Sequence, residues 1–190
     1  SESNTHTKLK MPIGDSDFRD ILNNKCVYVD KTLLAKEIID AGEKVILITR
    51  PRRWGKTLGM SMLKYFFTLE VDKQGKEVEL NSNRVLFDNL KIAGTDSINE
   101  QGKYPVIFIS LKEVKGTTYQ HVENKLKLVM SSIFSEYKYI GDSIKDENDN
   151  IKFKQILDRT ASYEDLTDSI QFLSKLILAY HNKAPILLLD

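Results

Sequence analysis

The sequence predicts an α/β protein in which helices cover both faces of a parallel β-sheet. Three runs of four apolar residues are typical of strands buried on both faces, because they lack the alternation of a half-exposed strand. Segments with one apolar helical face separate these runs, and this alternation favours a three-layer sandwich. The three predicted strands are Val45–Ile48, Val106–Ile109 and Ile186–Leu189.

Two short helices and a further strand are expected ahead of the first buried run. Asp15 or Ser16 can cap the first helix, and Asp30 or Thr32 can begin the second. Gly42 then stands where a left-handed residue ends a helix. The apolar residues that define these segments are Phe18, Ile21 and Leu22 in the first helix, Cys26–Val29 in the strand, and Leu33, Leu34, Ile38 and Ile39 in the second helix.

Longer helices are expected after each of the first two buried strands. One begins near residue 58, and residues 72–83 form a polar connection after it. Another runs from Tyr119 to Tyr137, and the charged run Gly141–Asn150 is interpreted as a mobile loop. Ser162–Asp165 resembles a capping box that opens a last helix before the third strand.

Composition indicates a soluble domain without a strong global charge. The chain has 190 residues, with 28 Lys and Arg against 27 Asp and Glu, so no overall field favours a nucleic-acid or membrane partner. Cys26 is the single cysteine, which excludes an internal disulfide. No apolar run reaches the ~20 residues that cross a bilayer, and the first ten residues lack the apolar core of a signal peptide. We therefore expect a cytoplasmic protein.

The segment Thr49–Thr57 carries the clearest chemical signal in the chain. It follows the first buried strand, precedes an amphipathic helix and ends in Gly55-Lys56-Thr57, the end of a Walker A motif. Glycine lets backbone N–H groups approach phosphate oxygens, the lysine reaches the β and γ oxygens, and the threonine hydroxyl coordinates Mg²⁺. The N-terminus of the following helix adds further N–H groups. The segment therefore predicts a phosphate-binding loop.

The loop departs from the G-x-x-x-x-G-K-T pattern at its first position, where this chain has Arg50. Pro51 fixes one φ angle and stiffens the loop. The three arginines can contact phosphate, face solvent or meet nucleic acid, and Trp54 can stack on a base or pack into the core. The predicted nucleotide-binding residues are Arg50, Pro51, Arg52, Arg53, Trp54, Gly55, Lys56, Thr57 and Leu58.

A carboxylate ends the third predicted strand. Four apolar residues followed by Asp190 fit a Walker B strand, whose acid would hold Mg²⁺ beside the Thr57 hydroxyl. An ordinary strand-ending aspartate is the alternative. A buried strand at the last residue predicts that the sheet continues in a longer protein. We therefore expect residues 1–11 to be a flexible arm and residues 12–190 to be the N-terminal part of one domain.

Blocks over most of the chain resemble the predicted AAA-ATPase-like proteins of bacteria, which are often fused to a C-terminal PD-(D/E)XK nuclease-like domain. The resemblance implies a P-loop fold of the AAA-like branch, ATP with Mg²⁺ as ligands, and a catalytic glutamate beyond Asp190. We therefore expect these 190 residues to bind ATP without hydrolysing it. The matching blocks are Pro12–Gly14, Asp17-Phe18, Tyr28–Leu33, Leu47–Thr57, Ser61–Phe67, Leu86-Phe87, Leu90–Ile92, Lys103–Phe108 and Leu187–Asp190.

Other interpretations stay open on the residues alone. Because Arg50 replaces glycine, the loop can belong to a degenerate scaffold that never hydrolyses nucleotide. The arginines can instead bind nucleic acid for a nuclease-like domain outside this chain, with a strong dependence on salt. Tyr28–Asp30 can border the adenine, although Asp30 serves equally well as a helix cap. The three histidines lack metal-ligand spacing, and we expect ordinary surface or capping roles for His6, His121 and His181.

Overall fold

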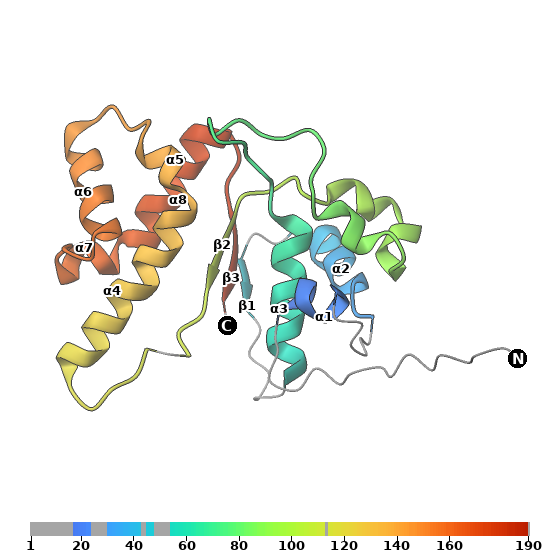
Figure 1. Cartoon of the computed structure of the whole chain (residues 1–190), viewed down its shortest axis with the longest axis horizontal. Helices are drawn as coiled ribbons and strands as arrows, with labels where there is room; N and C mark the ends of the chain where they lie inside the picture. Colours follow the sequence, from blue (N-terminus) through green and yellow to red (C-terminus); the bar gives the residue numbers. More distant parts are fainter. Residues whose placement is uncertain (1–16, 24–29, 43–44, 48–53, 113, 190) are drawn as a thin grey trace, which may run out of the picture.

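A computed structural model of the chain describes residues 17–23, 30–42, 45–47, 54–112 and 114–189, with only the backbone of 45–47 and 54–58. In these residues a parallel sheet of three strands lies between two layers of helices (Figure 1). The strand order is β1-β3-β2, so β3 is central. The strands are β1 (Val45–Leu47), β2 (Val106–Ile109) and β3 (Ile186–Leu189). The predicted α/β class with a parallel sheet is confirmed.

Side chains of β2 and β3 alternate between the two layers, as the period of a strand requires. Val106 and Leu188 are buried among residues of the layer that contains α3. Ile107 and Ile109 are buried on the opposite face, in the layer that contains α4 and α8. Both faces of the sheet are therefore apolar and covered, which explains why the strands read as continuous apolar runs.

The first layer packs around aromatic side chains. Phe18, Phe66 and Phe87 are fully buried, and the ring of Phe87 lies 5.2 Å, centroid to centroid, from each of the other two. Edge-to-face and offset pairs of this kind add to the area that they bury. The layer contains α1 (Phe18–Asn23), α2 (Leu33–Ala41), α3 (Trp54–Phe67) and three short 3-10 helices, η1 (Arg84–Phe87), η2 (Lys91–Gly94) and η3 (Asp96–Glu100).

The second layer is built around the long helix α4 and the helix that leads into β3. Phe134 of α4 and Phe153 are buried with ring centroids 5.1 Å apart, and Leu173 and Ile177 are fully buried beside them. Figure 1 shows this layer on the opposite side of the sheet from α3. Its helices are α4 (Tyr119–Glu136), α5 (Lys138–Gly141), α6 (Glu147–Leu157), α7 (Tyr163–Thr167) and α8 (Ser169–His181).

The expected mobile loop at 141–150 is wrong, because a helix begins inside it. Asp146 accepts a hydrogen bond from the backbone N–H of Asp149 and caps α6. The acidic residues of the first turn suit the positive end of a helix. Phe153 and Ile156, three positions apart, are buried and hold α6 on the core. The charged run is thus the solvated start of an amphipathic helix.

The helix ends agree with the predictions at some positions and differ at others. Gly42 ends α2 with φ 69°, as predicted, and Ser162 caps α7 through the Asp165 N–H. The last helical segment divides at Asp168 into α7 and α8. Asp17 accepts from the Asp20 N–H at the start of α1, whereas Asp15 and Ser16, the expected caps, lie outside the described residues. The expected strand Cys26–Val29 also lies outside them.

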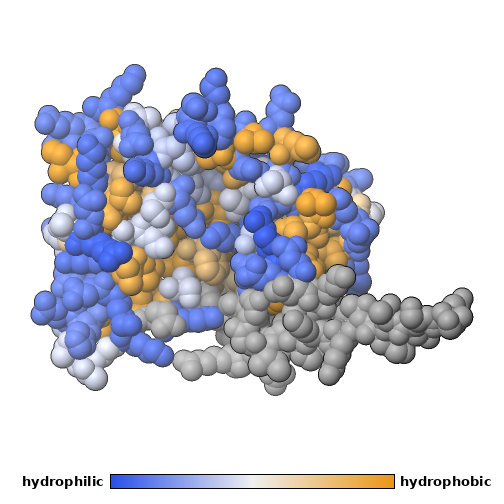
Figure 2. All heavy atoms as spheres, in the orientation of Figure 1, coloured by the Kyte–Doolittle hydropathy of each residue, from blue (hydrophilic) through white to orange (hydrophobic). Residues whose placement is uncertain are grey.

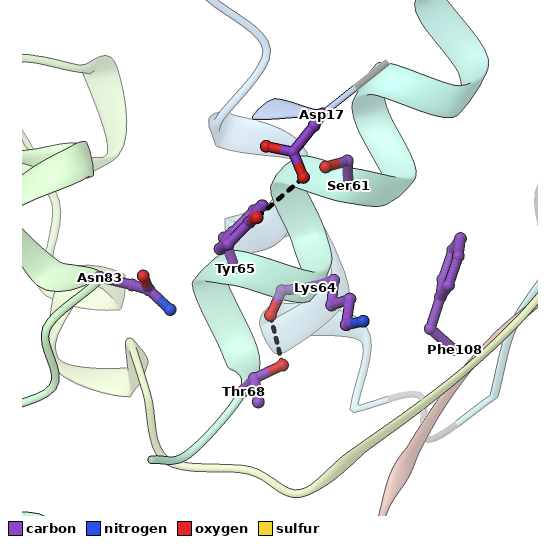
Figure 3. Close-up of a pocket in the computed structure, with 7 residues that line it drawn as sticks. All are labelled: Asp17, Ser61, Lys64, Tyr65, Thr68, Asn83 and Phe108. Atoms are coloured by element: carbon purple, nitrogen blue, oxygen red, sulfur yellow. Dashed lines mark hydrogen bonds between the residues drawn. The ribbon is translucent and has the colours of Figure 1, made fainter. Parts of the chain in front are cut away.

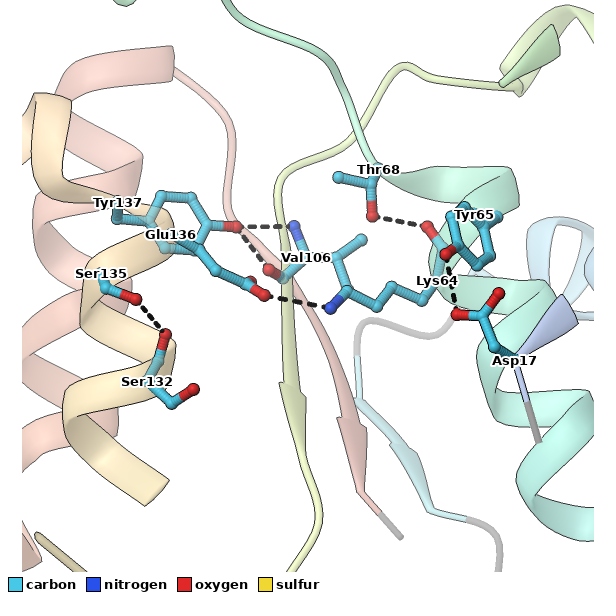
Figure 4. Close-up of polar contacts among 9 residues, drawn as sticks. All are labelled: Asp17, Lys64, Tyr65, Thr68, Val106, Ser132, Ser135, Glu136 and Tyr137. Carbon is cyan, nitrogen blue, oxygen red and sulfur yellow. Dashed lines mark hydrogen bonds and ion pairs between the residues drawn. The ribbon is translucent and has the colours of Figure 1, made fainter. Parts of the chain in front are cut away.

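Side chains from both layers meet at the outer edge of β2. The Tyr137 hydroxyl accepts from the Val106 N–H at 3.0 Å and donates to the Val106 carbonyl (Figure 4). Lys64 of α3 and Glu136 of α4 form an ion pair of 3.1 Å next to it. An edge strand exposes backbone groups that invite unwanted pairing, and the tyrosine satisfies both groups of one residue.

The surface has mixed polarity. Figure 2 shows apolar groups over both helical layers, interspersed with hydrophilic side chains. Leu80 at 79% and Val85 at 66% are exposed apolar side chains, and both lie in the connection between α3 and β2. Among the described residues, no helix has the length and apolar character needed to span a membrane.

Candidate functional site

The junction between β1 and α3 carries the predicted phosphate loop. The last residue of β1 is Leu47 and the first of α3 is Trp54, so Gly55-Lys56-Thr57 lies within the first turn of the helix. The first four N–H groups of a helix have no acceptor within it, and they point toward the space before the helix. Of the nine predicted binding residues, 50–53 lie outside the described residues, and 54–58 are described by their backbone alone.

Strand register defines the edge of the sheet at which this junction lies. Leu47 of β1 is paired in parallel with Leu189 of β3. The segments that follow these two strands therefore leave the sheet at the same edge, where open α/β sheets bind their ligands. Asp190 is the next residue after Leu189 and lies outside the described residues.

Burial fixes which face of α3 points to the core. Met60, Leu63 and Phe66 are fully buried, whereas Lys64 and Tyr65 are half-buried. This one-sided burial locks the helix on the sheet and keeps its first turn at the end of β1. The predicted helix after the phosphate loop is confirmed, and it begins at Trp54.

A pocket of about 330 Å³ lies along the half-buried face of α3 (Figure 3). The Tyr65 hydroxyl donates to the Asp17 carboxylate at 2.8 Å. Burial and this bond raise the pKa of Tyr65 to about 12, so the phenol stays neutral at physiological pH. The residues that line the pocket are Asp17, Ser61, Lys64, Tyr65, Thr68, Asn83 and Phe108.

Sequence reasoning did not single out this pocket. Ser61, Lys64 and Tyr65 of α3 and Thr68 directly after it recur at positions i, i+3, i+4 and i+7. This spacing marks one helical face and was the available signal. Asp17 and Phe108 reach the same place only through folding, because they are 91 positions apart in the chain (108 minus 17). Ser61 also accepts from the Phe18 N–H at 2.9 Å and thereby fixes α1 on α3.

Asp30 is an anchor between two elements. One carboxylate oxygen accepts from the N–H and the hydroxyl of Thr32, and the other accepts from the Lys91 N–H at 2.7 Å. Partial burial raises the pKa of Asp30, but these hydrogen bonds outweigh it and hold the pKa below its usual value. The Thr32 hydroxyl accepts from the Ile92 N–H. These contacts make Asp30 a tie between the start of α2 and η2.

The histidines differ from the expectation in one case. His121 is exposed in the first turn of α4, but the His181 side chain is only 2% exposed and contacts Glu77 and Tyr139. A surface role for His181 is therefore wrong. His6 lies outside the described residues. Within the described part of the chain, no group of three or more His, Cys, Asp or Glu side chains is arranged to hold a metal ion.

The helix-covered parallel sheet defines an α/β protein. The Gly-Lys-Thr sequence lies at the start of a helix that follows one of its strands, and this junction is a candidate phosphate-binding site. The family model described as "Predicted AAA-ATPase" matches residues 12–173. The chain belongs to this AAA-ATPase-like family, and family membership implies nucleotide binding in general. No curated protein and no solved structure matches the chain.

Proposed function

We propose that this chain is an ATP-binding domain with a P-loop fold. Residues 50–58 hold the phosphates, and Thr57 and Asp190 hold Mg²⁺. The proposal rests on one observation: β1, the Gly-Lys-Thr sequence and α3 follow one another along the chain. The helix starts directly at the motif, and the motif falls within the family match. A turn that contained Gly-Lys-Thr by chance would have no reason to lie between a sheet strand and an amphipathic helix.

The chemistry follows from the residue types. Free N–H groups and the positive end of the α3 dipole attract the phosphate chain. Lys56 would neutralise the β and γ oxygens, and the Thr57 hydroxyl would be one oxygen ligand of Mg²⁺. The paired β1 and β3 bring the segment after Leu47 and the residue after Leu189 to one edge of the sheet. This register supports Asp190 as the carboxylate on the same cation.

A thermal-shift titration with ATP and Mg²⁺ tests the proposal. A ligand that binds only the folded state stabilises it by about 2.7 kcal/mol at a hundredfold excess over Kd. At this chain length each kcal/mol raises Tm by about 2–4 °C. Lys56→Ala should abolish the shift and leave the Tm of the unliganded protein nearly unchanged.

Lys64→Ala is the matched control, because it removes a lysine from the same helix two turns away from the motif. Its ATP-dependent shift should equal that of the wild type. An equal shift in Lys56→Ala and wild type would refute the phosphate-loop assignment. Phosphate release in the same samples then separates a hydrolase from a scaffold that only binds nucleotide.

A further inference from the structure

The hydrogen bonds between β2 and β3 determine which backbone groups of β2 face its outer edge. The Ile186 N–H donates to the Pro105 carbonyl at 2.9 Å, and Val106 is the parallel partner of Ile186. Alternate residues of a strand bond to the same neighbouring strand. The residues on either side of Val106 therefore bond to β3, whereas Val106 and Phe108 turn their N–H and carbonyl groups to the outer edge.

The two outward-facing residues differ in their partners. The Tyr137 hydroxyl binds both backbone groups of Val106. No described residue bonds to the backbone N–H or carbonyl of Phe108. Unpaired groups at a strand edge can pair with a further extended segment. The outer edge of β2 is thus closed at Val106 and open at Phe108.

The pocket along α3 lies beside this open position, because Phe108 lines it (Figure 3). The ion pair between Lys64 of α3 and Glu136 of α4 shows that helices flank the edge on both sides (Figure 4). A second copy of the chain would bring its own flanking helices to the same edge. The space therefore fits a single extended segment better than the edge of another sheet.

The chain that precedes Asp17 continues from the wall of this pocket. Asp17 lines the pocket, and its carboxylate accepts from the Tyr65 hydroxyl at 2.8 Å. The next residue, Phe18, donates its N–H to the hydroxyl of Ser61, which also lines the pocket. Two hydrogen bonds to α3 therefore fix the point at which residues 1–16, which lie outside the described residues, join the described chain.

Residues 11–16 have the composition of an extended segment with an apolar anchor. Met11, Pro12 and Ile13 are three consecutive apolar residues. Proline disfavours the helical conformation at the residue before it, and it cannot continue a helix. The family match begins at residue 12, so the residues next to Asp17 belong to the matched domain. An extended chain spans about 3.3–3.6 Å per residue, so Ile13 can lie anywhere within about 14 Å of Asp17.

We propose that residues 11–16 add to the open edge of β2 at Phe108 and that the Ile13 side chain fills the pocket between Phe108 and α3. The added backbone pairs with the N–H and carbonyl of Phe108. Ile13 covers the rings of Tyr65 and Phe108, which are half-buried without it. The segment thereby ties the start of α1 to β2 across α3. This docking does not depend on the proposed ATP-binding function.

Amide hydrogen exchange in the full chain tests the docking, with the Val106 amide as an internal reference. Both amides should be protected in the wild type, Val106 by Tyr137 and Phe108 by the added segment. Ile13→Asp places a charge in the pocket and should accelerate exchange at Phe108, relative to Val106, by about tenfold or more. Thr7→Asp is the matched control, because it adds the same charge ahead of the family match and should leave this ratio unchanged.

An unprotected Phe108 amide in the wild type would overturn the proposal, and this measurement needs no variant. The same relative rate in the wild type and in Ile13→Asp would also overturn it. Protection of Phe108 that rises with protein concentration would assign the edge to a second copy of the chain instead.

Disulfide trapping covers the case in which Ile13→Asp does not fold. In a Cys26→Ser background, Ile13→Cys is combined either with Asn83→Cys inside the pocket or with the exposed Asp20→Cys. Docking should make the intramolecular disulfide with position 83 form about tenfold faster than that with position 20. A freely moving segment would reach both positions, and equal rates would overturn the docking. None of these variants lies within the predicted phosphate loop, so the Lys56 test stands apart from this one.

Discussion

The two ends of α3 can be compared: segments far along the chain contact its C-terminal end, and the Gly-Lys-Thr motif lies at its N-terminal end. At the C-terminal end, the carbonyls of the last helical residues and of Thr68 accept hydrogen bonds from segments far along the chain. Gly102 and Tyr104 donate their N–H groups to Phe66 and Phe67 at 2.7 and 2.9 Å. Side-chain amides donate to the two remaining carbonyls, Asn81 to Thr68 at 3.0 Å and Gln101 to Tyr65 at 3.3 Å.

The N-terminal end begins at Trp54, and its first N–H groups have no acceptor within the helix. At the starts of α4, α6 and α7, Thr118, Asp146 and Ser162 accept from an N–H three positions on, whereas the residues that precede Trp54 lie outside the described part of the chain. This is the end that the Gly-Lys-Thr motif assigns to phosphate. Under the proposed function, the protein anchors α3 at its C-terminal end, and a ligand binds at its N-terminal end.

The comparison of the two ends of α3 predicts that substitutions at one end affect stability and that substitutions at the other affect ligand binding. Substitutions at the anchored end should reduce the free energy of unfolding and spare nucleotide affinity. Substitutions at the ligand end should do the reverse, because a phosphate loop contributes little to the core. Three substitutions test this division, in decreasing order of expected effect.

Phe66→Ala should destabilise the fold by about 3–5 kcal/mol, because it leaves a cavity in the aromatic cluster of a fully buried side chain. Urea unfolding measures this loss. Tyr119→Ala, at a ring that is 66% exposed, is the control and should change stability by only about 0.5 kcal/mol. A loss at Phe66 below about 1 kcal/mol would contradict the packing of α3 on this core.

Asn81→Ala should cost about 1–3 kcal/mol, because it removes a buried cap at the C-terminal end of α3. The side chain also accepts from the N–H of Asn83 and from the Gln101 amide, so three partners lose a bond. Ser82→Ala, at an exposed neighbour, should change stability by only about 0.5 kcal/mol. The ATP-dependent Tm shift should persist in Asn81→Ala, and its loss would break the division between the two ends.

Arg50→Ala or Arg52→Ala should weaken the binding of ATP more than the binding of ADP if the guanidinium contacts the γ-phosphate. We expect a loss of about tenfold in ATP affinity, which corresponds to about 1.4 kcal/mol, with little change in stability. Calorimetric titration of both nucleotides measures it, with Arg84→Ala as the control outside the predicted binding set. Equal losses for ATP and ADP would indicate general electrostatics, and no loss would assign these arginines to the solvated surface.

Local sequence patterns predicted the helices and strands whose positions follow from the spacing of apolar residues. The strands Val106–Ile109 and Ile186–Leu189 have the predicted bounds, and α4 begins at Tyr119 as expected. Continuous apolar runs and a single apolar face are visible in sequence because burial follows the strand and helix periods. Gly42 was predictable for a similar reason, since its left-handed φ excludes most other residues.

Predictions failed where a residue's role depends on distant partners. The run 141–150 is charged, and its last four residues begin a helix that Asp146 caps and that the burial of Phe153 and Ile156 holds on the core. By residue type His181 was expected in an ordinary surface or capping role, and only the fold brings Glu77 and Tyr139 into contact with its side chain. Thr32 stands at the start of α2, but its hydroxyl serves η2 and makes no capping bond in the helix.

The sequence by itself determined the α/β class, the apolar strands and the family, because composition, periodicity and motif spacing are local properties. It also determined which residues are candidates for phosphate and Mg²⁺. Only the tertiary structure decided that β3 lies between β1 and β2, that residues 101–104 anchor one end of α3, and that Glu77 contacts His181. These features join segments many residues apart, and chain entropy lets many such pairings compete until packing of the whole core selects one.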